Sequence, residues 1–149
     1  MINLRPMLCS MILALASAPV LAAQPASTTC DRECLRSKVT EVLYALLKHD
    51  ITKLPVAPNL RVTEDAVEKP LNRVGLVTTV TALRGFRQDF IDERTGVVGA
   101  HVMVEEVGAP VMLVVRLKIE AEKISEMELV ATRSKADGIR ARTVRQMAP

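Results

Sequence analysis

Aromatic side chains and the residues of common catalytic motifs are scarce in this sequence. Trp is absent, Tyr occurs once and Phe twice. The two histidines, His49 and His101, do not form an H-x-x-H or H-E-x-x-H zinc-binding arrangement. A glycine-rich phosphate loop and a G-x-S-x-G nucleophile motif are also missing. The composition therefore names no reaction, and we expect neither a cofactor nor a metal ion.

Cysteine is also rare, with three residues in the chain. Cys30 and Cys34 stand four residues apart in C-D-R-E-C, at the start of a helical pattern. This spacing brings two helical Cα atoms to about 6 Å, which is within disulfide range. A disulfide between them is the favoured interpretation, and free or intermolecular thiols are an alternative. Metal binding is a third, but without a nearby histidine the pair makes an incomplete zinc site.

The N-terminus has the three regions of a secretory signal peptide. A basic residue precedes an apolar run over residues 7–18, and small residues follow it. We expect a signal peptide over residues 1–23, cleaved after Ala22 or Ala23, and a short leader over 24–29. The run is about a dozen residues long, whereas a membrane-spanning helix needs about 20. The sequence thus predicts an exported protein, periplasmic or secreted, without a membrane span.

The mature chain is nearly neutral. Loss of Arg5 with the signal peptide leaves 19 of the 20 basic residues, against 17 acidic ones. The remaining length fits one domain with a single core, which we place at residues 30–132. Residues 133–149 form a basic tail without interleaved aromatic residues. We interpret this tail as a flexible or weakly helical end, attracted to anionic lipid or polysaccharide or simply solvated, and not as a nucleic-acid site.

Hydrophobic periodicity predicts an α+β fold. Residues 31–49 show a helical apolar stripe, which comprises Leu35, Val39, Val42, Leu43, Leu46 and Leu47. Four segments alternate apolar and polar residues as half-buried strands do, and they span 86–91, 97–106, 110–120 and 124–132. A short strand-like segment, 60–64, and an irregular stretch lie between the helix and these strands. We expect the helix to pack on a curved, mainly antiparallel sheet.

Three segments carry a resemblance to a known superfamily. The long helix ends in His49-Asp50, the L-P-V-A-P link follows, and the chain closes on V-V-R-L-K-I-E-A-E-K-I-S-E-M-E-L-V. Together they resemble the nuclear transport factor 2-like superfamily, and the C-D-R-x-C-L element at 30–35 is similar to that of an exported branch. The resemblance implies a cone-shaped fold with a cavity between helix and sheet.

The same resemblance implies several functions. Relatives include ketosteroid isomerase, scytalone dehydratase and polyketide cyclases, and also non-catalytic binding or association domains. We therefore expect a small apolar ligand in the cone cavity; the alternatives are a lyase, dehydratase or isomerase using acid–base chemistry there, and a self-association domain. Pockets in this superfamily are often lined with aromatic residues. Here only Tyr44, Phe86 and Phe90 are available, which disfavours stacking recognition of a flat aromatic or steroid substrate.

The strand pattern also predicts a polar row on one face of the sheet. Pairing Lys118 with Glu126 places Arg116 opposite Glu128. Closing the preceding turns then sets His101 beside Arg116 and Arg87 beside His101. The row is either a solvated or dimer-facing ladder, giving a possible homodimer through the sheet, or a site where His101 is a general acid or base tuned by Arg116 and Glu128. The opposite face is expected to form the core under the helix, and comprises Phe86, Phe90, Val98, Ala100, Val102, Val104, Leu113, Val115, Leu117, Met127 and Leu129.

Further candidates lie near the expected mouth of the cavity. His49 and Asp50 could act there in catalysis, although the helix dipole favours a cation at this position and Asp commonly ends helices. Glu64 and Asp65 could supply a carboxylate for proton abstraction, or they could be solvated. Tyr44 lies across the helix from the leucine stripe, so it is either exposed or faces a second layer. None of these residues forms a triad of defined spacing.

Overall fold

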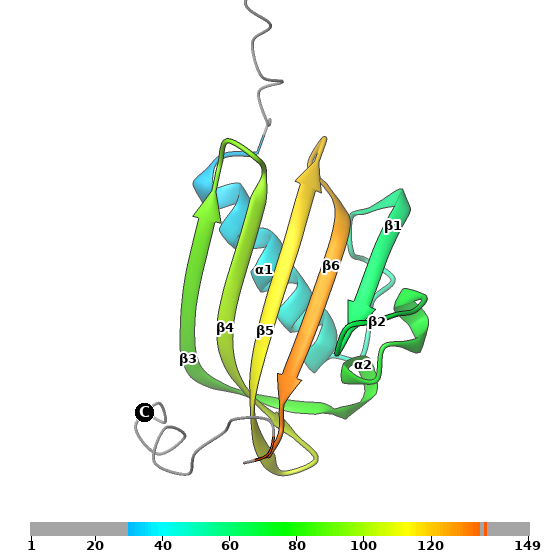
Figure 1. Cartoon of the computed structure of the whole chain (residues 1–149), viewed down its shortest axis with the longest axis vertical. Helices are drawn as coiled ribbons and strands as arrows, with labels where there is room; N and C mark the ends of the chain where they lie inside the picture. Colours follow the sequence, from blue (N-terminus) through cyan, green and yellow to red (C-terminus); the bar gives the residue numbers. More distant parts are fainter. Residues whose placement is uncertain (1–29, 135, 137–149) are drawn as a thin grey trace, which may run out of the picture.

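A long helix lies against the concave face of a six-stranded sheet (Figure 1). The computed structural model describes residues 30–134 and 136, so the predicted signal peptide, the leader and nearly all of the predicted tail lie outside the described residues. The elements are α1 (Arg32–Leu47), β1 (Val56–Glu64), β2 (Val67–Glu68), η1 (Leu71–Arg73), α2 (Leu76–Thr79), β3 (Val80–Asp92), β4 (Val97–Glu106), β5 (Ala109–Glu120) and β6 (Lys123–Thr132). The predicted α+β architecture is confirmed.

Helix α1 begins where the sequence predicts. The Asp31 carboxylate accepts a hydrogen bond from the Cys34 backbone N–H at 2.9 Å, as an N-cap residue does. The predicted disulfide is confirmed, because Cys30 and Cys34 are bonded across a Cα–Cα distance of 5.2 Å. The apolar stripe is buried except for Leu47, which is half-buried. Within residues 30–134 and 136, no helix is both long and apolar enough to cross a membrane.

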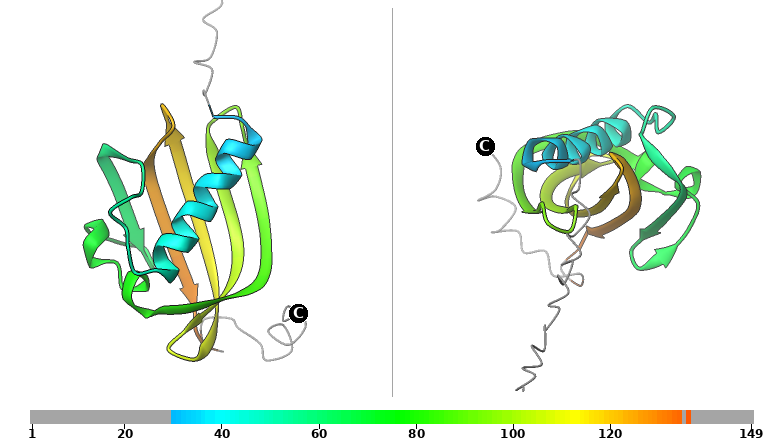
Figure 2. Two further views of the ribbon diagram at one scale, coloured as in Figure 1. Left: turned by 180° about the vertical axis from the view of Figure 1, so that it is seen from behind. Right: turned by 90° about the horizontal axis from the view of Figure 1, so that it is seen from above.

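The sheet has the strand order β2-β1-β6-β5-β4-β3. The strands from β3 to β6 form an antiparallel meander, whereas β1 pairs with β6 in parallel. The meander curls around α1, as the view from above shows (Figure 2). The side chains between helix and sheet are almost wholly inaccessible, and they include Leu35, Leu46, Leu113, Leu117, Met127 and Leu129. This arrangement gives one core on the concave side.

The predicted pairing of Arg116 with Glu128 is confirmed, but the other two registers are wrong. His101 lies opposite Val114 and not Arg116, because the β4–β5 turn contains only Val107 and Gly108. The shift is by two residues, so His101 stays on the predicted face.

Arg87 lies opposite Val102 instead of His101, because four residues, 93–96, connect β3 to β4. A slip of one residue moves each side chain to the other face of the sheet. Arg87 therefore points to the concave side, and Phe90 lies on the convex side with half of its surface exposed. Nine of the eleven predicted core residues are buried as expected, and the exceptions are Phe86 and Phe90.

Candidate functional site

A hollow opens between α1 and the edge strand β3. Its volume is about 260 Å³, and we call it the α1/β3 hollow. It reaches the concave side of the sheet, since Leu43 and Val102 of the core contribute to its lining. The eight lining residues are Thr40, Leu43, Tyr44, Leu83, Gly85, Phe86, Arg87 and Val102.

An irregularity in β3 forms one wall of this hollow. The pairing of β3 with β4 shifts between Leu83 and Arg87, so four steps along β3 match only two along β4. Gly85 lies in this bulge with a φ angle of 80°, a left-handed conformation that favours glycine. Because β3 is the last strand of the sheet, the extra residues can bend outward without disturbing another neighbour. The bulge thereby moves the backbone beside Phe86 away from the regular ladder.

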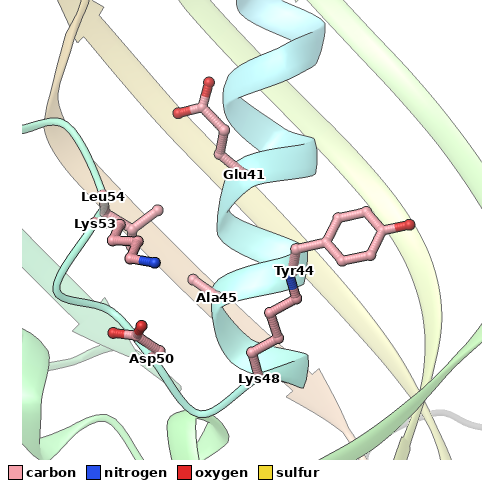
Figure 3. A pocket seen from close by; sticks show the side chains of 7 residues that line it. All are labelled: Glu41, Tyr44, Ala45, Lys48, Asp50, Lys53 and Leu54. Carbon is pink, nitrogen blue, oxygen red and sulfur yellow. The ribbon is translucent and has the colours of Figure 1, made fainter.

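Two aromatic rings border the α1/β3 hollow. Tyr44 is 49% exposed, and the Lys48 ammonium lies 5.7 Å from the centre of its ring. Figure 3 shows the Tyr44 ring projecting from α1 to the side opposite Lys53. Phe86 is half-buried in the opposing wall. The hollow therefore combines aromatic surface at its rim with an aliphatic floor.

Arg87 is the only charged residue among the eight that line the hollow. Its guanidinium makes three hydrogen bonds: Nε donates to Asp89 Oδ1 at 2.7 Å, Nη1 to Thr40 Oγ1 at 2.7 Å and Nη2 to the Arg36 carbonyl at 2.9 Å. These bonds connect β3 to α1 and hold the planar group in one orientation. The sequence analysis placed Arg87 on the opposite face of the sheet.

A second hollow lies on the other flank of α1, next to the chain that follows the helix (Figure 3). It measures about 240 Å³, and Asp50 and Lys53 lie on its rim. The side chain and backbone of Thr52 donate to Asp50 Oδ1, and these bonds lower the pKa of that carboxyl. Asp50 is thus an ionised turn residue at the end of the helix.

His49 and Glu64 make structural contacts at the same end of the domain. His49 Nδ1 lies 2.6 Å from the Val77 carbonyl oxygen and connects the end of α1 to α2. Burial would raise the pKa of Glu64, but hydrogen bonds from the Lys69 ammonium and the backbone N–H groups of Gly75 and Leu76 lower it overall. The Glu64 carboxylate therefore fixes the short segment that leads into β3.

Asp65 also belongs to a structural cluster. Burial would raise the pKa of Asp65, but a backbone bond from Ala131 at 2.8 Å and the Arg133 guanidinium lower it overall. Arg133 donates to Glu106 as well, and its pKa is raised because both carboxylates favour the charged guanidinium. This first residue of the predicted tail is therefore paired with the domain.

The convex face separates the members of the predicted polar row. Arg116 Nη1 lies 2.9 Å from a Glu126 oxygen and 3.3 Å from a Glu128 oxygen, and this pairing lowers the pKa of Glu126. His101 instead packs edge-on against Phe90, with ring centres 5.2 Å apart. A shallow groove of about 370 Å³ runs over this face, where Gly99 carries no side chain.

The four catalytic candidates do not converge. His49, Asp50 and Glu64 lie near the C-terminal end of α1 and beside α2, and His101 lies on the convex face. None of the four lines the α1/β3 hollow. Within the described part of the chain, no three His, Cys, Asp or Glu side chains are placed to hold a metal ion.

Sequence comparisons find no match. No protein-family model matches the chain. A search of curated proteins also gives no significant match.

Solved structures match the fold. A de novo designed protein with a curved β-sheet has a TM-score of 0.55 at 19% identity, over 78% of this chain and 96% of that one. AusH from Aspergillus nidulans has a TM-score of 0.53 at 15% identity, over 76% of this chain and 94% of that one. A steroid delta-isomerase from Pseudomonas aeruginosa has a TM-score of 0.53 at 10% identity, over 81% of this chain and 92% of that one.

These matches, with the open curved sheet around one helix, define an α+β cone. The chain has the nuclear transport factor 2-like fold that its sequence predicts. At such low identities the likeness shows the fold and no activity.

Proposed function

We propose that this domain binds a small apolar molecule in the α1/β3 hollow. The observation that carries the proposal is the lining of the hollow, where Tyr44 and Phe86 stand over the aliphatic side chains of Leu43, Leu83 and Val102. Ligand sites are typically apolar concavities with a few polar groups, and they measure about 300–1,000 Å³. At about 260 Å³, this hollow lies just below that range and suits a small ligand.

The arrangement favours binding over catalysis. Acid–base chemistry needs a titratable group within hydrogen-bond reach of the ligand. The four predicted catalytic residues lie outside the lining of the hollow, and Glu64 is occupied by three hydrogen-bond donors. Catalysis and self-association through the sheet stay predictions. The similarity to a steroid delta-isomerase is compatible with use of a cavity in this fold.

Export is part of the same proposal. The bond between Cys30 and Cys34 is compatible with an oxidising compartment, where such bonds persist. In that setting the domain would meet apolar molecules outside the cytoplasm. We therefore place the proposed binding in the periplasm or the secreted fraction.

The fluorescence of Tyr44 provides an intrinsic probe of ligand binding in the α1/β3 hollow. Tyr44 is the only tyrosine and Trp is absent, so intrinsic fluorescence reports on Tyr44 alone. We expect octan-1-ol, used as a neutral apolar probe, to change Tyr44 emission in a saturable way and to raise the thermal midpoint.

Two phenylalanines of β3 provide matched variants. Phe86→Ala removes a ring from the hollow, whereas Phe90→Ala removes one from the convex face. Complete burial of a Phe side chain contributes roughly 3 kcal/mol, and burial of one face of its ring contributes up to about half of that. Phe86→Ala should therefore weaken octan-1-ol binding roughly tenfold. Phe90→Ala should leave the affinity unchanged. The reverse order would place binding in the convex groove, and no response in the wild type would refute the proposal.

A further inference from the structure

We infer that the ligand of the α1/β3 hollow is an amphiphile with a carboxylate head group, which Arg87 binds. This inference rests on the proposed function and specifies its ligand class. Arg87 is the single charge among the lining residues, and the remaining lining is aliphatic, aromatic, glycine or Thr40. The hollow therefore offers one cationic contact beside an apolar one.

The guanidinium has capacity for a further partner. Arginine carries five N–H donors in a rigid plane, and the three hydrogen bonds of Arg87 use one donor on each nitrogen. As far as residues 30–134 and 136 are concerned, two N–H groups remain for a ligand. The existing bonds to Thr40, Asp89 and the Arg36 carbonyl already fix the plane, so a ligand would not have to order a free side chain.

The charges around Arg87 favour an anion. Among the described residues, the one carboxylate bonded to Arg87 is that of Asp89, which is shared: Oδ1 accepts from Arg87, and Oδ2 lies 3.2 Å from Arg36 Nε. Two guanidinium groups thus share a single carboxylate, whose side chain is 10% exposed. The other acid near Arg36 is Glu33, 3.6 Å away and 73% exposed, where water screens its charge. Lys48 adds a further cation beside the Tyr44 ring.

These features select among head groups. An ammonium would be repelled by Arg87, and a hydroxyl would gain only a neutral hydrogen bond. A carboxylate forms charge-assisted hydrogen bonds, which are about twice as strong as neutral ones and match the planar fork of arginine. The aliphatic and aromatic lining then accommodates a short hydrocarbon chain or ring. A medium-chain carboxylic acid has this combination.

Octanoate, octan-1-ol and octylamine test the inference because they share one hydrocarbon chain and differ in charge. We expect octanoate to bind the wild-type protein roughly tenfold more tightly than octan-1-ol by Tyr44 fluorescence, and octylamine to bind most weakly. The octanoate advantage should fall as salt is added. Equal affinities for octanoate and octan-1-ol would overturn the inference but leave the hollow as a binding site. If none of the three binds, the proposed function itself fails.

Arginine variants on one strand locate the effect. Arg87→Gln should reduce the octanoate preference to within about twofold. Arg84→Gln is the control, because Arg84 is also on β3 but pairs with Glu105 and does not line the hollow. The ratio of the octanoate affinity to the octan-1-ol affinity is compared within each variant, because a smaller folded fraction would affect both affinities equally. A preference that survives Arg87→Gln would refute the assignment to Arg87, and the salt dependence of the wild type decides the matter if that variant does not fold.

Discussion

Glu64→Gln separates a structural from a catalytic role for this carboxylate. Glu64 has a side chain only 7% exposed. Its Oε1 accepts from Leu76 N at 2.9 Å, and its Oε2 accepts from Gly75 N at 3.0 Å and from Lys69 Nζ at 2.6 Å. Glutamine keeps one acceptor oxygen, but its N–H₂ group takes the place of the other oxygen. A donor then faces N–H donors that have lost their acceptor. We therefore expect a loss of about 2–4 kcal/mol in the free energy of unfolding at pH 7.

The loss should depend on pH in a defined direction. The pKa of Glu64 is lower in the folded protein than its ordinary value, so its carboxylate stabilises the fold fully above the unfolded pKa of about 4.3. That contribution disappears as the pH falls through the lowered folded pKa. The difference between wild type and Glu64→Gln should therefore be constant from neutral pH to about pH 5 and then shrink.

Urea denaturation at a series of pH values measures this difference. Glu68→Gln is the matched control, because Glu68 lies across the same hairpin and is exposed. It should change the stability by less than about 0.5 kcal/mol. A Glu64→Gln effect as small as that of the control, or one that persists unchanged into acid, would refute the structural role and return Glu64 to the catalytic candidates.

Three further outcomes are expected. Leu46→Ala, at a fully buried helix position, should lower the free energy of unfolding by about 2–5 kcal/mol, whereas Glu33→Ala on the exposed face should change it by less than about 0.5 kcal/mol in the same urea titration. Val107→Asn should raise the thermal midpoint. Val107 is 79% exposed and has a φ of 48°, a conformation that asparagine adopts more readily than a β-branched residue. A lower midpoint would contradict this prediction. Mass spectrometry of alkylated protein purified without reductant should find Cys30 and Cys34 unmodified, and labelling of both would mean that the disulfide does not form.

The sequence predicted most of the fold because its main strands alternate strictly. Strand β5 buries every second residue from Val111 to Ile119, as its sequence pattern requires. The pairing of the opposite charges Lys118 and Glu126 then gave the register of the last hairpin, with Arg116 opposite Glu128. Periodicity and cross-strand charge were sufficient where the strands are regular.

The candidate site could not be predicted equally well because it depends on irregular backbone. The loop before β4 is one residue shorter than the expected D-E-R-T-G turn, which reversed the faces of Arg87 and Phe90. The bulge beside Gly85 widens the space next to Tyr44 and Phe86. A glycine within a strand pattern often marks a bulge, so Gly85 was the one available signal. Its position alone does not say which way the chain bends.

The parallel pairing of β1 with β6 has a consequence for the order of folding. Arg61 lies beside Glu126 in this pair, although more than half of the domain separates them along the chain. Closing so long a loop is slow compared with forming the hairpins of the meander. We therefore expect β3 to β6 to assemble first and β1 to join last. A chain whose synthesis has not reached β6 cannot complete its sheet, so the domain stays open until nearly all of it has been made.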